Sequence, residues 1–245
     1  MHPGWLLNSY LVADEPGGHG VLIDAGAPPE FLIAAARRHE LTVSHLLLTH
    51  RHADHVAEVE AYREELGIEV LAHPLEAPHI EGVDRAIEPG ELLEVGALHI
   101  DGLHTPGHTD GMLAFRVGNE AVFTGDTLFK GSIGGVKAPG STTFEDIKAS
   151  ILDVLLKLPH ETKVHPGHTD PTTIGDEWEQ NAFVRMWRGL DPEGDERCSV
   201  GDERARLVLF APDYDGGHKA WVRWEDSGRD DIVPGSAVQR ESDAG

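Results

Sequence analysis

The sequence predicts a mixed α/β fold in which two β-sheets are packed together with helices outside, followed by a small β-rich appendage. Apolar runs of strand length alternate with helical patterns near both ends of the segment 1–190. The stretch between them contains several short strands, and after about Pro192 the chain becomes charged and glycine-bearing. We therefore expect a core domain over residues 1–190, then a linker and a β appendage over 191–245.

The first part of the chain shows strand and helix signals in alternation. Pro28-Pro29 opens a helix, because proline suits the first helical turn. Residues 45–49 are almost continuously apolar, as in a strand that is buried on both faces. Gly67 ends the helix that follows. Strands are expected over 5–13, 20–24, 45–49 and 68–72. One helix is expected to begin at Pro28-Pro29, with its apolar positions before Arg37-Arg38, and another to run over roughly 54–66.

The second part is predicted from the same kinds of signal. Thr143 can cap a helix together with Asp146 three residues later, and an apolar face at helical spacing runs from Ile147 to Leu158. Asp191 to Arg206 has the charge and glycine content of a linker. We expect helices over 143–158 and 175–188, and strands over 92–95, 98–103, 112–117, 121–124, 163–164, 206–211, 219–224 and 231–233.

The composition limits the partners and the compartment. The 43 acidic residues outnumber the 20 basic ones, and a formal charge of -23 repels nucleic-acid phosphates. No apolar stretch has the roughly 20 residues that cross a bilayer, and residues 1–8 lack the segments of a secretory signal. One cysteine, Cys198, excludes an intramolecular disulfide. We expect a cytoplasmic monomer or homodimer that acts on a small molecule, with no membrane or nucleic-acid partner.

A dense group of metal-binding residue types follows the apolar run that ends at Thr49. In the run His50-Arg51-His52-Ala53-Asp54-His55, four side chains can ligate a metal. Imidazole nitrogens and carboxylate oxygens suit zinc and similar first-row ions. His50 and His52 can turn to one side of a loop, while Asp54 and His55 point to a neighbouring position. Four ligands cannot complete two sites, so other parts of the chain must supply more.

Three further candidates follow predicted strands. The sequence Pro-Gly-His-Thr-Asp occurs twice, over 106–110 and 166–170, and presents His108 and His168 after a tight turn. Asp126 lies at the Gly-Asp corner that ends the apolar strand over 121–124. Each of the three would carry little weight alone. Their agreement with the first cluster predicts that all seven side chains gather around two metal ions.

In this order and at roughly this spacing, these motifs resemble the metallo-β-lactamase superfamily over about residues 5–188. The resemblance implies a four-layer αββα sandwich in which residues 1–190 form the catalytic domain, with a dinuclear site at the shared edge of its two sheets. It implies that the first metal is bound by His50, His52 and His108. It also implies that the second is bound by Asp54, His55 and His168, and that Asp126 bridges the two.

This arrangement predicts a hydrolase. Two divalent ions lower the pKa of a bridging water, and the resulting hydroxide can attack a carbonyl or phosphoryl centre. Asp54 can orient that nucleophile and accept its proton. No serine or cysteine nucleophile is needed. Zinc is the expected metal, with iron and manganese as alternatives.

Residues 125–135, together with Thr172 to Gly175, resemble the glyoxalase II-like branch of the superfamily. That branch implies hydrolysis of a thioester or activated ester, with S-lactoylglutathione as the type substrate. It commonly has an arginine where this chain has Gly135, so recognition of glutathione does not follow. Lys130 and Lys137 are predicted to contact an anionic substrate.

Other functions of the same superfamily stay open. Lactone hydrolases share all seven ligands, and persulfide dioxygenases keep much of the motif with a single iron. A non-catalytic metal-binding module would be expected to lose at least one ligand, and a β-lactamase usually lacks the Asp54-His55 pair. The appendage after 200 lies outside the resemblance and is predicted to add stability or to bind a partner.

Overall fold

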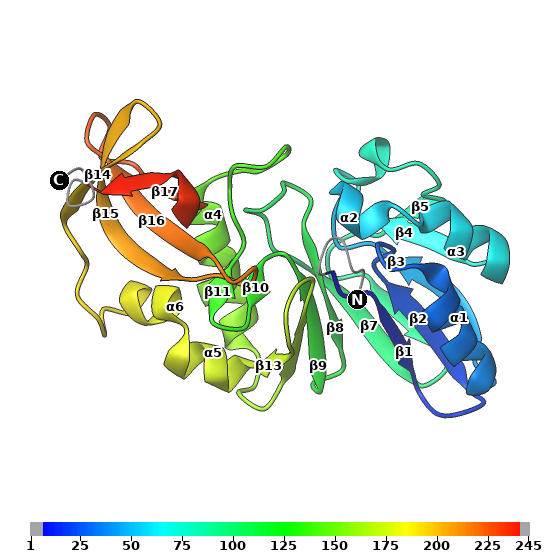
Figure 1. Ribbon diagram of the computed structural model, residues 1–245. Helices are drawn as coiled ribbons and strands as arrows, with labels where there is room; N and C mark the ends of the chain where they lie inside the picture. Colours follow the sequence, from blue (N-terminus) through cyan, green and yellow to red (C-terminus); the bar gives the residue numbers. More distant parts are fainter. Residues whose placement is uncertain (1–6, 241–245) are drawn as a thin grey trace.

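The structure is a computed structural model that describes residues 7–240, and it confirms a mixed α/β fold (Figure 1). Two large sheets form the middle of the segment that precedes residue 190. The strand order is β1-β2-β3-β4-β5 in the first sheet and β13-β12-β9-β8-β7-β6 in the second. The first sheet consists of β1 (Tyr10–Ala13), β2 (His19–Ile23), β3 (Thr42–Leu47), β4 (Glu69–Ala72) and β5 (Arg85–Ala86). The second consists of β6 (Leu92–Val95), β7 (Leu98–His104), β8 (Leu113–Val117), β9 (Ala121–Gly125), β12 (Lys163–Pro166) and β13 (Thr172–Thr173).

Clusters of buried apolar side chains lie between the layers of sheets and helices. One cluster joins the two sheets and includes Ile23, Leu47, Phe115 and Phe123. Another lies under α1 (Pro29–Arg38) and α3 (Val59–Leu66), which cover the outer face of the first sheet. On the far side, α4 (Phe144–Ala149), α5 (Ile174–Gln180) and α6 (Ala182–Trp187) pack on the second sheet. The predicted four-layer order of helix, sheet, sheet and helix is thereby confirmed.

The helix predicted over 54–66 is in fact two helices, α2 (Ala53–Val56) and α3. The break has a tertiary cause, because the loop after β2 inserts its backbone there. Ala25 N donates to the carbonyl of His55 at 2.7 Å, and Glu58 N donates to the carbonyl of Ala25 at 2.8 Å. Gly26 allows this approach, since a Cβ at that position would lie 1.5 Å from the carbonyl oxygen of Asp54. Gly67 ends α3 with a φ of 65°, as predicted.

The helix expected over 143–158 begins as predicted and then changes its pitch. Thr143 and Asp146 form the predicted capping box at the start of α4. The chain continues through a π-helical turn (Ser150–Val154) and a 3₁₀ turn (Leu155–Lys157). The helix expected over 175–188 is divided between α5 and α6 at Asn181, whose side chain caps α6. A short hairpin of β10 (Leu128–Phe129) and β11 (Ser132–Ile133) was not predicted.

The capping box provides a stability test away from the polar clusters described below. In Thr143→Ala, the backbone N–H of Asp146 loses an acceptor that lies 3.1 Å away. We expect the free energy of unfolding to fall by about 1 kcal/mol, as measured by urea denaturation. Thr143→Ser keeps the hydroxyl and should retain most of that stability. Equal losses in both variants would contradict the capping role.

The C-terminal segment forms a third sheet, in the order β17-β16-β15-β14-β18. Its strands are β14 (Glu196–Val200), β15 (Glu203–Pro212), β16 (His218–Trp224), β17 (Asp230–Pro234) and β18 (Val238–Arg240). The prediction of a linker over 191–206 was wrong, because β14 and the start of β15 occupy most of this segment. The exposed Glu196 and Arg197 precede the buried Cys198 in β14, and the strand pairs along β15 from Glu196 to Val200.

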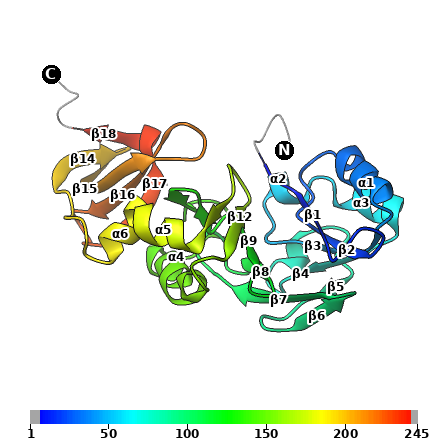
Figure 2. The ribbon, with the colours of Figure 1, turned by 90° about the horizontal axis from the view of Figure 1, so that it is seen from below.

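The C-terminal sheet is packed onto the rest of the protein. Val208, Trp221 and Ile232 belong to the same buried cluster as Ile147 of α4 and Phe183 of α6. Figures 1 and 2 show the sheet beside these helices, at the end of the molecule away from α1 and α3. Among residues 7–240, no helix has the length and apolar character to cross a bilayer.

Candidate metal centre

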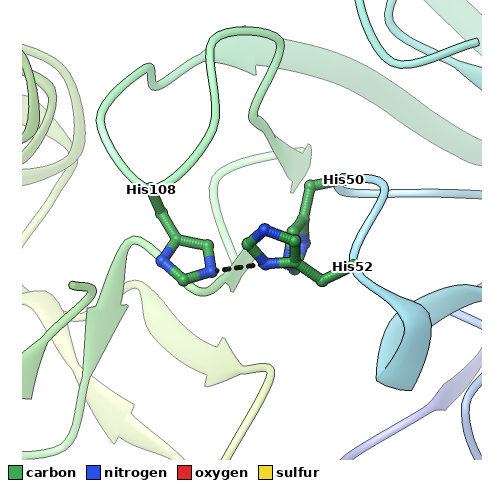
Figure 3. Close-up of side chains that lie close together, drawn as sticks. All are labelled: His50, His52 and His108. Atoms are coloured by element: carbon green, nitrogen blue, oxygen red, sulfur yellow. Dashed lines mark hydrogen bonds between the residues drawn. The ribbon is translucent and has the colours of Figure 1, made fainter. Parts of the chain in front are cut away.

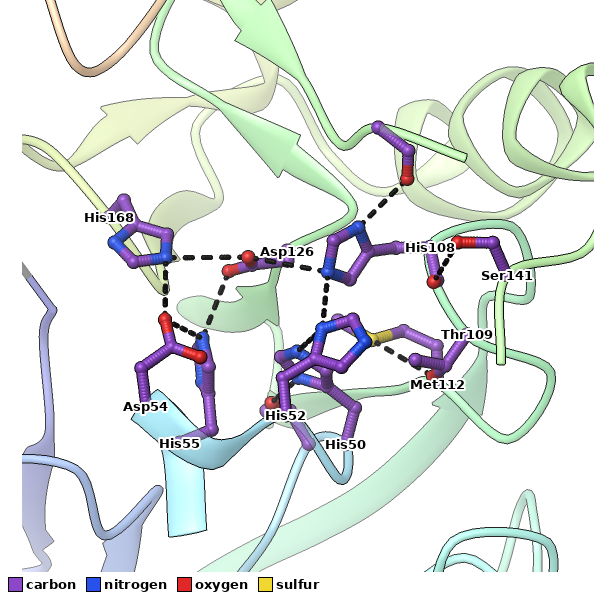
Figure 4. A network of polar contacts seen from close by, with 12 residues as sticks. His50, His52, Asp54, His55, His108, Thr109, Met112, Asp126, Ser141 and His168 are labelled. Carbon is purple, nitrogen blue, oxygen red and sulfur yellow. Dashed lines mark hydrogen bonds and ion pairs between the residues drawn. The ribbon is translucent and has the colours of Figure 1, made fainter. Parts of the chain in front are cut away.

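Strand ends bring the seven predicted ligands together, although separate segments of the chain supply them (Figure 4). β9 and β12 are parallel neighbours, and Gly125 pairs with Pro166 at their carboxyl ends. Asp126 is the next residue after Gly125, and His168 is two residues after Pro166, so these two side chains lie close together. The cluster from His50 to His55 follows β3 in the facing sheet.

His108 comes from the loop between β7 and β8. That loop needs Gly107, whose φ is 144°, and a Cβ there would lie 2.4 Å from the Cβ of Ile147 in α4. The close contact between this glycine and the helix explains the Pro-Gly pair before His108.

Three imidazoles converge at one side of the site (Figure 3). His50 Nε2 lies 3.0 Å from His52 Nδ1, and His108 Nε2 lies 2.9 Å from that same atom. These inward nitrogens approach one another closely enough to share a single small cation.

The outward nitrogens of these rings determine which tautomer each ring adopts. His108 Nδ1–H donates to the carbonyl of Gly135 at 2.8 Å, and His52 Nε2–H donates to the carbonyl of Pro139 at 3.0 Å. A carbonyl oxygen only accepts, so each outward nitrogen carries the proton. In the neutral form of such a ring, the inward nitrogen carries a lone pair that faces the other inward nitrogens. A cation between them would remove this repulsion.

Burial keeps two of these rings neutral. It lowers the pKa of His108 to about 4 and the pKa of His50 well below its usual range, because an imidazolium ion is poorly solvated there. Neutral imidazole is the form that ligates a metal. The donor set and its protonation state therefore fit a metal ion.

A second cluster contains Asp54, His55 and His168 together with Asp126. His168 Nε2 lies 3.5 Å from Asp54 Oδ2 and 3.3 Å from Asp126 Oδ2. His55 Nε2 lies 3.2 Å from Asp126 Oδ1, yet both of these buried atoms lack a hydrogen-bond partner. Buried polar atoms are rarely left in this state without an ion or a water molecule to satisfy them. The second cluster therefore also fits a metal.

Asp126 stands between the two clusters. Its Oδ2 lies 3.5 Å from His108 Nε2 of the first cluster, and its Oδ1 faces His55 of the second. Burial would raise the pKa of Asp126, but His55 and His168 hold it well below its usual range. An ionised carboxylate in this position can bind both metals. Within residues 7–240, three groups of side chains can hold an ion: His50-His52-His108, His50-His55-Asp126 and Asp54-His55-His168.

The sequence analysis missed two residues that position these ligands. Asp24 accepts hydrogen bonds from His55 Nδ1 at 2.8 Å and from the backbone N–H of Thr49 at 2.8 Å. Glu76 is fully buried and accepts from Arg51 N and Gly111 N, so it ties the two histidine loops together. Asp24 directly follows the strand β2, whose last residues are apolar, and this position could have identified it. Glu76 follows no comparable pattern.

Asp24 also provides a test of ligand orientation. Asp24→Asn would place an amide N–H₂ against His55 Nδ1 and favour the ring tautomer whose Nε2 carries the proton and cannot ligate. We expect the affinity for the second metal to fall by about 10- to 100-fold, measured by competition with a chelator. Asp195→Asn, at a side chain that is 83% exposed, is the control. Unchanged affinity in Asp24→Asn would show that this carboxylate does not orient His55.

The two lysines predicted to contact the substrate form ion pairs with acidic side chains. Lys130 is exposed and pairs with Asp170 at 3.6 Å, whereas the Lys137 ammonium pairs with Asp231. His165, three residues before His168, stacks on the ring of Phe123 outside the two clusters.

A cavity of about 530 Å³ opens onto His108 and Asp126. Phe129 of β10 and the loop residues Gly135 and Lys137 form part of its wall, and the C-terminal sheet forms most of the rest. This volume is typical of a site for a small molecule.

Comparisons with known proteins agree with this geometry. The profile of the Metallo-beta-lactamase superfamily matches residues 3–168. An uncharacterized protein of Aquifex aeolicus is 35% identical over 196 residues, which are 73% of this chain and 92% of that protein. The hydroxyacylglutathione hydrolase of a Polaromonas species is 34% identical over 163 residues, 65% of this chain and 61% of the hydrolase. This chain thus matches less than two thirds of the hydrolase.

Three solved structures are similar. BLEG-1, a B3 metallo-beta-lactamase, has a TM-score of 0.67 at 31% identity and covers 73% of this chain and 94% of its own. ETHE1 from Myxococcus xanthus has a TM-score of 0.68 at 29% identity, and the match covers 76% of this chain and 83% of ETHE1. TTHA1623, solved in a di-iron-bound form, has a TM-score of 0.63 at 38% identity, and the match covers 75% of this chain and 98% of TTHA1623. The chain belongs to the metallo-beta-lactamase superfamily, and its relatives support the glyoxalase II-like branch.

Proposed function

We propose that this protein is a dinuclear metal-dependent hydrolase of thioesters or activated esters. The observation that carries the proposal is the pair of ligand clusters that share Asp126 and contain buried, unsatisfied ligand atoms. His50, His52 and His108 would hold one ion. Asp54, His55 and His168 would hold the other. Asp126 would contact both.

The two ions, when bound, activate a water molecule for attack and polarise the carbonyl group of the substrate. The protein's own groups prepare this chemistry. Asp54 is partly exposed, and although burial would raise its pKa, hydrogen bonding to His168 keeps that pKa below the ordinary value. As an ionised carboxylate beside the site, Asp54 can accept a proton from the nucleophile. Cys198 is buried in the C-terminal sheet and plays no part.

The similarity to hydroxyacylglutathione hydrolases supports a thioester substrate, although the match covers only part of those enzymes. The nitrogen-rich donor set supports zinc, while the di-iron form of TTHA1623 supports iron as the alternative. The protein is proposed to act in the cytoplasm, as a monomer or homodimer, on a small molecule that fits the cavity. The same site also suits the hydrolysis of lactones.

Two measurements on one purified sample test the proposal. We expect elemental analysis to find two metals per chain. We also expect turnover of thioesters in a panel that contains lactones, phosphodiesters and a cephalosporin. One iron with oxygen consumption on a persulfide would instead identify a dioxygenase, the function suggested by the likeness to ETHE1. Preferred turnover of the cephalosporin would favour the function suggested by BLEG-1. Absence of metal and of turnover would favour a binding module.

A further inference from the structure

The C-terminal sheet contributes most of the wall of the cavity that reaches the metal ligands. Of the eighteen residues that line this cavity, twelve lie between Phe210 and Ser236. We propose that this sheet is the substrate-recognition wall of the enzyme and selects a substrate with an uncharged, apolar acyl group. The inference rests on the proposed hydrolase function and adds the substrate class.

Polar contacts hold the sheet against the site. Asp213 accepts a hydrogen bond from the hydroxyl of Ser132 in β11 at 2.8 Å. Lys219 is buried and pairs with Asp213 at 3.1 Å, and its ammonium also donates to the carbonyl of Ile133. Because these contacts join β16 and its preceding turn to the hairpin beside Asp126, the wall has a defined position relative to the reacting atoms.

The turn between β15 and β16 places an aromatic side chain directly on a predicted metal ligand. The ring of Tyr214 stacks on His168, with centroids 4.5 Å apart and an interplanar angle of 11°. The same ring contacts Phe129, with centroids 4.9 Å apart. Tyr214 and Phe129 both line the cavity. A substrate bound at the metals would therefore lie against aromatic surface.

The charges of the cavity disfavour an anionic acyl group. Each of its two lysines already has an acidic partner, Asp213 for Lys219 and Asp231 for Lys137. Asp213 and Asp215 themselves line the cavity, and Ile232 and Pro234 add apolar surface. A carboxylate on the acyl group would lose hydration without gaining an unpaired cation. An apolar group would replace water at an apolar wall.

Gly135 allows the cavity to be narrowed without backbone strain. It lines the cavity, a Cβ built on it meets no atom within 4 Å, and its φ lies outside the left-handed region. Gly135→Phe should therefore fill space that an acyl chain would occupy. Gly135→Ala is the matched control, because it adds one methyl group at the same backbone position.

The test compares three thioesters of N-acetylcysteamine that differ only in the acyl group: acetyl, hexanoyl and adipoyl. Adipoyl has the length of hexanoyl and ends in a carboxylate. For the natural sequence we expect kcat/KM for hexanoyl to exceed that for adipoyl by at least about tenfold. Gly135→Phe should lower the ratio of hexanoyl to acetyl by about tenfold, and Gly135→Ala should change it by less than about twofold. Equal use of hexanoyl and adipoyl, or a ratio that Gly135→Phe leaves unchanged, would overturn the inference.

Binding without turnover separates this inference from the proposed function. The probe is the ketone analogue of the hexanoyl thioester, in which a methylene replaces the sulfur, and calorimetry measures its affinity. We expect Gly135→Phe to weaken binding of the ketone analogue by about tenfold, with the metal content unchanged. This result would support the recognition wall even if no thioester is hydrolysed. Failure of the analogue to bind the metal-loaded protein would overturn the wall, even if short thioesters are hydrolysed.

Discussion

Asp126→Asn is expected to abolish the proposed thioester hydrolysis, with a loss in kcat of about a thousandfold or more, and to lower the metal content below the proposed two ions per chain. The carboxylate oxygens lie 3.2 to 3.5 Å from the ring nitrogens of His55, His108 and His168. An amide has nearly the same shape but carries no charge. Its N–H₂ group would donate to one of these nitrogens and occupy a ligand position. The variant would therefore lose the bridge and one imidazole at once.

The comparison that isolates this effect is Asp101→Asn. Asp101 lies on β7, pairs with Arg116 at 2.9 Å and is only 15% exposed, but it does not belong to either metal-binding cluster. We expect this control to keep two metals and full turnover, as measured by elemental analysis after dialysis and by steady-state kinetics. Two bound metals and undiminished turnover in Asp126→Asn would rule out the bridging role.

The second large effect is expected from Trp221→Ala, with a loss of about 3–5 kcal/mol in the free energy of unfolding. Trp221 is 3% exposed, and its ring centroid lies 5.1 Å from that of Phe144 in α4. It shares a buried cluster with Ile147, the residue against which Gly107 is packed. The truncated side chain would leave a cavity between the C-terminal sheet and the helix that supports the His108 loop.

Trp224→Ala provides the comparison, because Trp224 belongs to the separate cluster on the other face of the C-terminal sheet. Denaturant unfolding should show a loss for both variants. Only Trp221→Ala should also weaken metal binding, since its cluster lies next to the His108 loop. Unfolding of the C-terminal sheet alone, with no change in the stability of the remaining chain, would contradict the shared core.

The candidate ligands were accessible to sequence analysis because each follows an element that the apolar pattern reveals. Asp126 comes directly after the short apolar strand β9, and His168 comes two residues after the end of β12. The cluster from His50 comes shortly after the run of leucines over 46–48. Parallel neighbouring strands end at the same edge of a sheet, so local signals at distant positions indicate one site. The structure brings all seven residues together there. The capping box at Thr143 was predictable for the same reason, since its partners are close neighbours in the sequence.

The supports of the site were not predictable in this way. Glu76 acts through backbone donors of two other loops, and the division of the helix after Ala53 depends on hydrogen bonds from Ala25. Neither contact leaves a periodic pattern in its own segment. The sequence pattern did not predict the strand β14, because its exposed residues are charged. Its pairing with β15 in the structure identifies it as a strand.

The sequence was therefore sufficient for the superfamily, the four layers of the sandwich and the candidate ligands, because these depend on short-range patterns of apolar and metal-binding residues. The position of the C-terminal sheet beside these ligands required the folded structure. Tyr214 and His168 lie far apart in the sequence, and their rings stack because the C-terminal sheet is packed on the helices and the hairpin beside the site. Contacts of this kind depend on the packing of whole elements, for which no local pattern exists.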